Sequence, residues 1–149
     1  RGSGVIYDLM PHLIDLSSAI FRKIDLNYLK KPNQISFENR SPDYASITFN
    51  DSKKIINYEV SYVSWKNHFS IDLYSKKFSI HLNGLNKWGK SIIEIRKRTF
   101  PSGKPKIKTY KYNVKDISFF SETNDFIKNK LHSQLKQILF YSKFIDKIS

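Results

Sequence analysis

Apolar residues at helical spacing mark the first part of the chain. They recur every three or four positions within residues 5–21, at Leu9, Leu13, Leu16 and Ile20. This spacing is typical of the buried stripe of a helix. Because Pro11 cannot donate a backbone hydrogen bond, we expect it either in the first turn of the helix, with Asp8 as the N-cap, or at a kink.

From residue 35 onward the period changes from helical to alternating, which is typical of strands. The alternating segments are 35–38, 44–49, 55–65, 68–74, 77–82, 91–99 and 106–113. Short connections favour antiparallel neighbours, so we expect a meander, with about six strands in one sheet.

The last segment, 122–148, returns to a helical period, and Thr123 or Asn124 offers a cap. Its apolar side comprises Phe126, Leu131, Leu135, Ile138, Leu139 and Ile145. Helix, meander and helix predict an α+β fold. We expect an open-faced, mainly antiparallel sheet of about six strands, with the N-terminal and C-terminal helices packed on one face.

The length and composition of the chain indicate that this α+β fold is a single domain over residues 1–149. The chain has no Cys, and it has no apolar run long enough to cross a bilayer. The lack of Cys excludes a disulfide scaffold, a thiolate zinc site and cysteine catalysis, and it fits a reducing compartment, so we expect the cytoplasm. Since patterned sequence follows directly on Arg1-Gly2-Ser3-Gly4, we expect a fragment that starts inside a longer protein.

The chain is strongly basic, with 26 Lys and Arg, 13 Asp and Glu, and a formal net charge of +13. Such a charge suits a polyanionic partner such as nucleic acid. The basic residues are mostly Lys, however, and they are spread over the whole length, so we favour A/T-rich codon usage and solvated faces as the explanation. We interpret the densest stretch, 96–115, as a protruding hairpin with a Lys-protected edge; the alternative is a hairpin that contacts phosphates.

One Asp and one His stand four residues apart in the predicted N-terminal helix, Asp8 and His12. If the backbone between them is helical, both side chains project to the same side. A carboxylate beside an imidazole orients it, and such pairs are common in general acid–base catalysis. The plain alternative is an N-cap Asp followed by a polar His on a half-exposed helix face.

The residues around this pair read Gly4-Val5-Ile6-Tyr7-Asp8-Leu9-Met10-Pro11-His12-Leu13-Ile14-Asp15-Leu16. This stretch resembles the start of the C-terminal domain of the Gfo/Idh/MocA oxidoreductases, a family that includes glucose-fructose oxidoreductase and inositol dehydrogenase. Those enzymes carry a Gly-rich entry and then D-x-G-x-H-x-x-D-L before an apolar helix. This chain has Met10 where the family has a small residue. The close match ends near Ile20, and the meander and closing helix extend it loosely over the chain.

The resemblance implies a C-terminal substrate-binding and oligomerisation domain of an NAD- or NADP-dependent oxidoreductase. Its substrate would be a sugar, nucleotide sugar or cyclitol hydroxyl. His12 would be the general base that takes the hydroxyl proton, Asp8 would tune it, and Asp15 would be structural. In the family, the cofactor and a Lys of an E-K-P motif belong to an N-terminal Rossmann domain. This chain contains neither G-x-G-x-x-G nor E-K-P, so we expect the fragment alone to bind no cofactor and to be inactive.

The remaining polar and aromatic residues predict fewer features. His68, His81 and His132 have no carboxylate at ligand spacing, and Asp72 and Glu94 have no acidic partner at an obvious register, so we expect neither a metal site nor a carboxylate pair. Aromatic residues alternate with apolar ones in the strands, which favours burial and a homo-oligomer formed through the open sheet face. Two rival classes remain: a basic, aromatic-rich sheet domain that binds nucleic acid, and a non-catalytic dimerisation domain.

Overall fold

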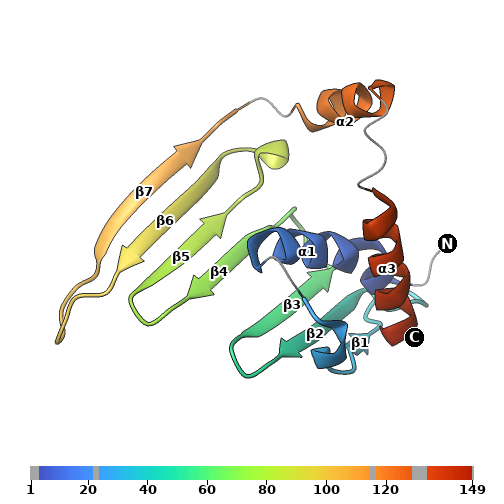
Figure 1. The fold of residues 1–149 in the computed structure, drawn as a ribbon, viewed down its shortest axis with the longest axis horizontal. Coiled ribbons are helices and arrows are strands. Elements are labelled where there is room, and N and C mark those ends of the chain that lie inside the picture. The colour runs from blue at the N-terminus through green and yellow to red at the C-terminus, as the bar shows by residue number, and fades with distance from the viewer. Residues whose placement is uncertain (1–3, 22–23, 115–116, 129–133, 149) are drawn as a thin grey trace. The chain divides into compact units, whose positions relative to one another are not determined.

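The structure, a computed structural model, describes residues 4–21, 24–114, 117–128 and 134–148. Helices and antiparallel sheets in this part of the chain confirm the predicted α+β class (Figure 1). The α-helices are α1 (Val5–Phe21), α2 (Ser118–Ile127) and α3 (Gln134–Ile148), and the single-turn helices are η1 (Leu26–Tyr28) and η2 (Asn86–Trp88).

The described strands form two separate hydrogen-bonded sheets rather than one. In chain order they are β1 (Asn33–Ile35), β2 (Tyr44–Asn50), β3 (Ile55–Ser61), β4 (Ser70–Tyr74), β5 (Phe78–Asn83), β6 (Ser91–Lys97) and β7 (Lys106–Tyr112). The first sheet has the order β1-β2-β3 and the second β4-β5-β6-β7, with every neighbouring pair antiparallel. The division falls between β3 and β4, because the chain leaves the first ladder after Ser61 and enters the next at Ser70.

The chain also divides into two compact units, and each is described by itself. The first unit comprises residues 1–64 and 130–149, and the second unit comprises residues 65–129. A single domain over 1–149 therefore stays a prediction.

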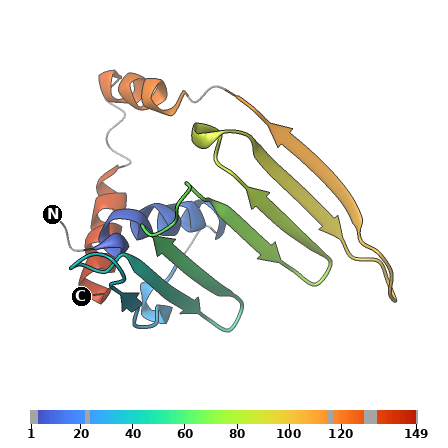
Figure 2. The ribbon, with the colours of Figure 1, turned by 180° about the vertical axis from the view of Figure 1, so that it is seen from behind.

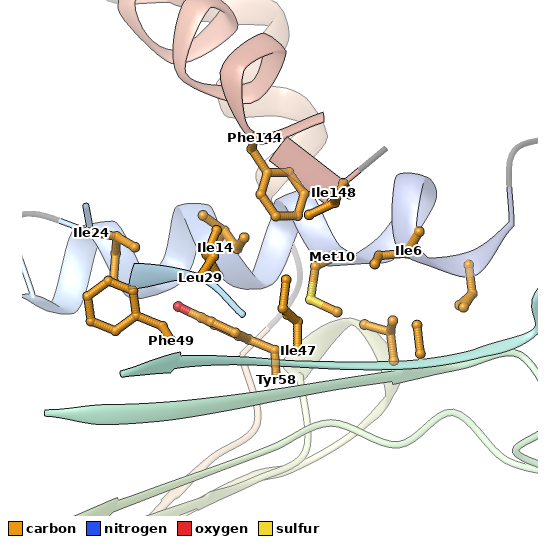
Figure 3. Packing of buried hydrophobic residues seen from close by; sticks show 13 residues of the cluster. Ile6, Met10, Ile14, Ile24, Leu29, Ile47, Phe49, Tyr58, Phe144 and Ile148 are labelled. Atoms are coloured by element: carbon orange, nitrogen blue, oxygen red, sulfur yellow. The ribbon is translucent and has the colours of Figure 1, made fainter. Parts of the chain in front are cut away.

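The hydrophobic core of the first unit lies between α1 and the three-stranded sheet (Figures 1 and 2). Alternate residues of β2 and β3 point at the helix, as the period of two predicts. Phe144 and Ile148 of α3 pack against the same cluster, as Figure 3 shows. The buried members are Val5, Ile6, Met10, Ile14, Ile24, Leu29, Ala45, Ile47, Phe49, Tyr58, Val60, Phe144 and Ile148. Burying each large side chain stabilises the fold by about 1.5–3 kcal/mol.

The sequence pattern predicted the wrong buried face of α1. The residues that the helix buries are offset by about one position along the chain from the stripe that was expected to be buried. The helix buries Ile6, Met10, Ile14 and Ser17, whereas Leu9 and Leu13 are only half-buried and Ile20 is exposed. A step of one residue turns a helix by about 100°, so an adjacent apolar stripe can compete for the same core. The range 5–21, expected to hold a helix or a loop leading into one, is α1 itself, but the N-cap expected at Asp8 was wrong because α1 already begins at Val5. Asp8 therefore lies in the first turn instead of at the N-cap, and Pro11 lies inside the helix.

The described part of the C-terminal segment contains two helices, α2 and α3, where a single one was expected over 122–148. Phe126 of α2 and both Ile138 and Leu139 of α3 are exposed, so the predicted apolar side is not a core face. Phe144 and Ile148 take that role. Leu131 and the side chain of Leu135 lie outside the described residues.

In the second unit, the register of β4 to β6 places most aliphatic side chains on one face of the sheet and most polar ones on the other. One face carries aliphatic residues, namely Ile71, Leu73, Ile80, Leu82, Ile93 and Ile95. The other face, called the polar face below, carries Asp72, Tyr74, Ser79, His81, Glu94 and Arg96. None of the helices in the described ranges has the length and apolar content needed to cross a bilayer.

Candidate functional site

The helix that carries Asp8 and His12 starts at a close approach between two segments. Gly4 has a φ of +91°, and a Cβ added there would lie 2.9 Å from the carbonyl oxygen of Pro42. The N–H of Val5 donates to the same carbonyl at 2.8 Å, which satisfies one of the free donors at the N-terminus of α1. Because only Gly fits this conformation without strain, Gly4 fixes where α1 begins.

The next residue along the loop, Asp43, is fully buried and organises the chain before β2. Its carboxylate accepts hydrogen bonds from the backbone N–H groups of Phe37, Glu38 and Asn39 at 2.8, 2.8 and 3.0 Å. These bonds, above all the one from Phe37, outweigh desolvation and lower the pKa of Asp43 to about 2. The carbonyl oxygen of Asp43 accepts from the N–H of Tyr62 at 2.8 Å.

Consecutive carbonyls, of Pro42 and Asp43, thus hold the start of α1 and the residue that follows β3. This arrangement brings the hydroxyl of Tyr62 to 2.5 Å from Oδ2 of Asp8, to which it donates a hydrogen bond. Partial burial of the phenol, together with the hydrogen bond to Asp8 and the charge of its carboxylate, raises the pKa of Tyr62 to about 12. Tyr62 is therefore a protonated donor at neutral pH, and Asp8 is its acceptor.

A second Tyr–Asp pair lies further along the same helix. The hydroxyl of Tyr141, in α3, hydrogen-bonds Asp15. Burial of the phenol, that hydrogen bond and the carboxylate charge all raise the pKa of Tyr141. Asp15 therefore joins α1 to α3, which is a structural role.

His12 lies between these two Asp residues in sequence and is exposed. The helix is continuous over Asp8 and His12, so their spacing places both on one side of α1, as predicted. Within the described residues, however, no hydrogen bond or ion pair joins His12 to Asp8. The arrangement is an open imidazole on a helix whose neighbouring carboxylates are each held by a Tyr from another element.

The described residues do not offer a cradle for NAD or NADP. A dinucleotide site of the Rossmann type needs a Gly-rich turn between a parallel strand and a helix. Here every strand pair is antiparallel, and Gly84 and Gly89 flank the single-turn helix η2 between two antiparallel strands. Across the same ranges, no group of three or more His, Cys, Asp or Glu residues is arranged to hold a metal ion.

The second unit contains a polar cluster that the sequence did not predict. Nδ1 of His81 lies 2.6 Å from Oδ1 of Asp72, although no carboxylate partner was expected for this His. The pair arises because Asp72 and His81 are opposite each other in the β4–β5 register. Nε2 of the same ring lies 2.8 Å from Oγ of Ser79. A turn placed on Ser75 to Phe78 would have predicted the Asp72–His81 pairing. His132, considered together with His68 and His81 as a possible metal ligand, falls outside the described residues.

Comparisons with known proteins do not identify the chain: no family model matches it, no curated protein matches it, and no solved structure matches it.

Proposed function

We propose that this chain supplies the substrate-side general base of an NAD- or NADP-dependent oxidoreductase acting on a sugar, nucleotide sugar or cyclitol hydroxyl. In this proposal the imidazole of His12 accepts the proton of the substrate hydroxyl. Asp8 and Tyr62 are positioning residues, because they fix the turn of α1 from which His12 projects. The proposal takes its reaction class from the resemblance of residues 4–16 to the Gfo/Idh/MocA oxidoreductases.

The observation that carries the proposal is the open imidazole of His12 beside carboxylates that are already satisfied. A general base needs an unoccupied nitrogen within reach of the substrate and a fixed direction of approach. His12 is exposed, and the bonds from Tyr62 to Asp8 and from Tyr141 to Asp15 hold both neighbouring turns of α1 in place. The helix itself is anchored on the sheet by the buried Ile6, Met10 and Ile14 side chains.

The cofactor site belongs, in this proposal, to another part of the protein, since the described residues provide no dinucleotide cradle. The contribution of this chain is then limited to binding the substrate, orienting its hydroxyl and accepting the proton. The role of His12 has to be tested in a protein that contains both parts.

The test is turnover by the full-length protein with NAD or NADP and a panel of sugars, nucleotide sugars and cyclitols. Formation of the reduced nicotinamide is followed by its absorbance. We expect His12→Ala to lower kcat by about 100-fold or more, the usual scale for the loss of a general base. The matched control is His68→Ala, which removes another exposed His, one that lies outside α1 in the sequence.

Turnover that survives His12→Ala unchanged would refute the role of His12. Absence of turnover with every polyol and sugar, in a protein that binds the dinucleotide, would favour the non-catalytic dimerisation domain instead. Tyr62→Phe separates positioning from chemistry, because it keeps His12 and is expected to change KM and kcat together.

Two further parts of the proposal concern assembly and location. We expect a homo-oligomer formed through the aliphatic face of the second sheet, where Ile71, Leu73, Ile80, Leu82, Ile93 and Ile95 lie together. Sedimentation equilibrium of the full chain tests this, and a monomer at every concentration would contradict it. A cytoplasmic location stays a prediction.

The second candidate function is binding of nucleic acid by the second unit. Residues 65–129 carry more than half of the Lys and Arg residues of the chain but well under half of its Asp and Glu residues. Trp65 is fully exposed, and Trp88 is half-exposed. This candidate predicts binding of a generic oligonucleotide that weakens steeply with salt and is indifferent to His12→Ala.

A further inference from the structure

The polar face of the second sheet holds a Ser, a His and an Asp in one hydrogen-bonded line. Oγ of Ser79 lies 2.8 Å from Nε2 of His81, and Nδ1 of His81 lies 2.6 Å from Oδ1 of Asp72. All three residues belong to the β4–β5 hairpin, so the register of that hairpin alone sets the geometry.

The order of the contacts determines which nitrogen of His81 carries the proton. An ionised carboxylate only accepts hydrogen bonds, so Nδ1–H of His81 donates to Asp72. In the neutral ring Nε2 is then the acceptor, and the hydroxyl of Ser79 donates to it. This tautomer is the one that a base needs in order to take a proton from a Ser hydroxyl.

The surroundings of the imidazole fix it further. The side chain of His81 is only 12% exposed, whereas the side chain of Asp72 is 52% exposed. The ring of Tyr74 packs edge-on against it at a centroid distance of 5.5 Å. The imidazole is therefore held between β-sheet neighbours, with one nitrogen directed at Asp72 and the other at Ser79.

A cation stands beside Ser79 on the next strand. Arg96 is opposite Ser79 in the β5–β6 register, which places both side chains on the polar face with Cβ atoms about 4.5–5.5 Å apart. Its Nε and Nη2 donate to Oε2 of Glu94 at 3.2 and 2.6 Å, which holds the guanidinium close to the sheet. The carboxylate of Glu94, opposite His81 in the same register, balances that charge, so Arg96 lines the polar face beside Ser79 as one half of an ion pair.

We propose that Ser79 is a nucleophile activated by His81 and Asp72, and that the polar face of the second sheet catalyses hydrolysis of small carboxylic esters. Oγ of Ser79 forms a bond to the carbonyl carbon, and its proton passes to Nε2 of His81. The ester C–O bond breaks, and the leaving alcohol takes that proton. Water then attacks the acyl-Ser79 ester, gives a proton to Nε2, and releases the carboxylic acid as Oγ regains its proton. The step needs no oxidant or reductant.

The substrate class follows from where the cluster lies. Ser79 is half-buried on a sheet face, so its substrate has to be compact around the carbonyl to reach it. Small, unhindered esters with a good leaving group meet this condition. The cluster lies entirely in the second unit, so the inference is independent of the function proposed for His12.

The test is covalent labelling of the full chain with a fluorophosphonate, a probe that reacts with activated Ser hydroxyls. Intact mass reports one adduct, and peptide mapping locates it. We expect the adduct on Ser79, with Ser79→Ala abolishing it and His81→Asn or Asp72→Asn slowing it by about 100-fold or more. The same four proteins are assayed for hydrolysis of an activated acetate ester, and we expect an initial burst that Ser79→Ala removes.

The chain provides a matched control in Ser70 and His68. Oγ of Ser70 lies 3.2 Å from Nε2 of His68, but no carboxylate of the described residues is hydrogen-bonded to that ring. We therefore expect no adduct on Ser70. An adduct on Ser79 that forms equally fast in Asp72→Asn and His81→Asn would overturn the proposal, as would no adduct at all. Ester hydrolysis that persists in Ser79→Ala would show His81 acting alone and would also overturn it.

Discussion

The hydroxyl of Tyr62 and the carboxylate of Asp8 are joined by a hydrogen bond of 2.5 Å, although 54 residues separate them along the chain. The bond links the end of the first sheet to the first turn of α1. Asp8 therefore acts as a structural tie as well as a neighbour of His12. A carboxylate already held by a phenol also leaves the imidazole open toward solvent.

This bond makes the stability of the first unit depend on pH in the alkaline range. The pKa of Tyr62 is about 12 in the folded protein against 10.0 without these contacts. Between those values the unfolded chain binds fewer protons than the folded one, so stability is full below pH 10 and falls as pH rises toward 12. We expect Tyr62→Phe to flatten this slope, measured as urea midpoints across the alkaline range. Tyr28→Phe, which changes an exposed Tyr with no acidic partner among the described residues, should leave the slope unchanged.

The lowered pKa of Asp43 predicts a pH dependence of stability at the acid end of the range, where stability falls as pH falls. Its pKa is lowered from 3.8 to about 2 by the backbone N–H donors of the preceding loop, Phe37 first. Its contribution is present above pH 3.8 and is lost as pH falls through about 2, because the unfolded chain takes up the proton first. Asp43→Asn should therefore lower the urea midpoint at neutral pH and remove this acid slope. Asp51→Asn, at a hairpin turn with two backbone donors, should lower the midpoint less.

The close approach of Gly4 to Pro42 predicts that a side chain at position 4 would destabilise the start of α1. Gly4→Ala forces a side chain into a positive φ and brings its Cβ to 2.9 Å from the Pro42 carbonyl. We expect a loss of about 1–3 kcal/mol in the free energy of unfolding, from strain at a backbone conformation that only Gly adopts readily. The control is Gly89→Ala, which also has a positive φ but no atom within 4 Å of the added Cβ. A smaller loss at Gly4 than at Gly89 would contradict the close approach.

Most strands could be predicted closely because alternation is a local property, but the strand expected at 35–38 shares only Ile35 with β1, Asn33–Ile35. The segment expected at 44–49 is β2, Tyr44–Asn50, and the one expected at 106–113 is β7, Lys106–Tyr112. The division into two sheets could not be predicted, since the alternating pattern runs on past Ser61, where the ladder ends. Pattern alone does not report which strands pair.

The candidate site also has features that are local in sequence and could be predicted, and others that depend on tertiary packing and could not. The spacing of Asp8 and His12 is local, so the shared side of α1 could be predicted. The partners of Asp8 and Asp15 are Tyr62 and Tyr141, and they come from a strand end and a distant helix. These contacts depend on tertiary packing, for which a single sequence carries no direct signal.

The buried face of α1 gives the sharpest comparison between sequence pattern and structure. Ile14 is fully buried between the helix and the sheet, whereas Ile20, part of the stripe that the sequence favoured, is 42% exposed. Ile14→Ala leaves a cavity and should cost about 2–5 kcal/mol in urea unfolding. Ile20→Ala removes the same atoms from a position that keeps contact with solvent, so its cost should stay within about 1 kcal/mol. Equal costs at the two positions would mean that α1 packs through the leucine stripe after all, and that His12 projects from a different side of the helix.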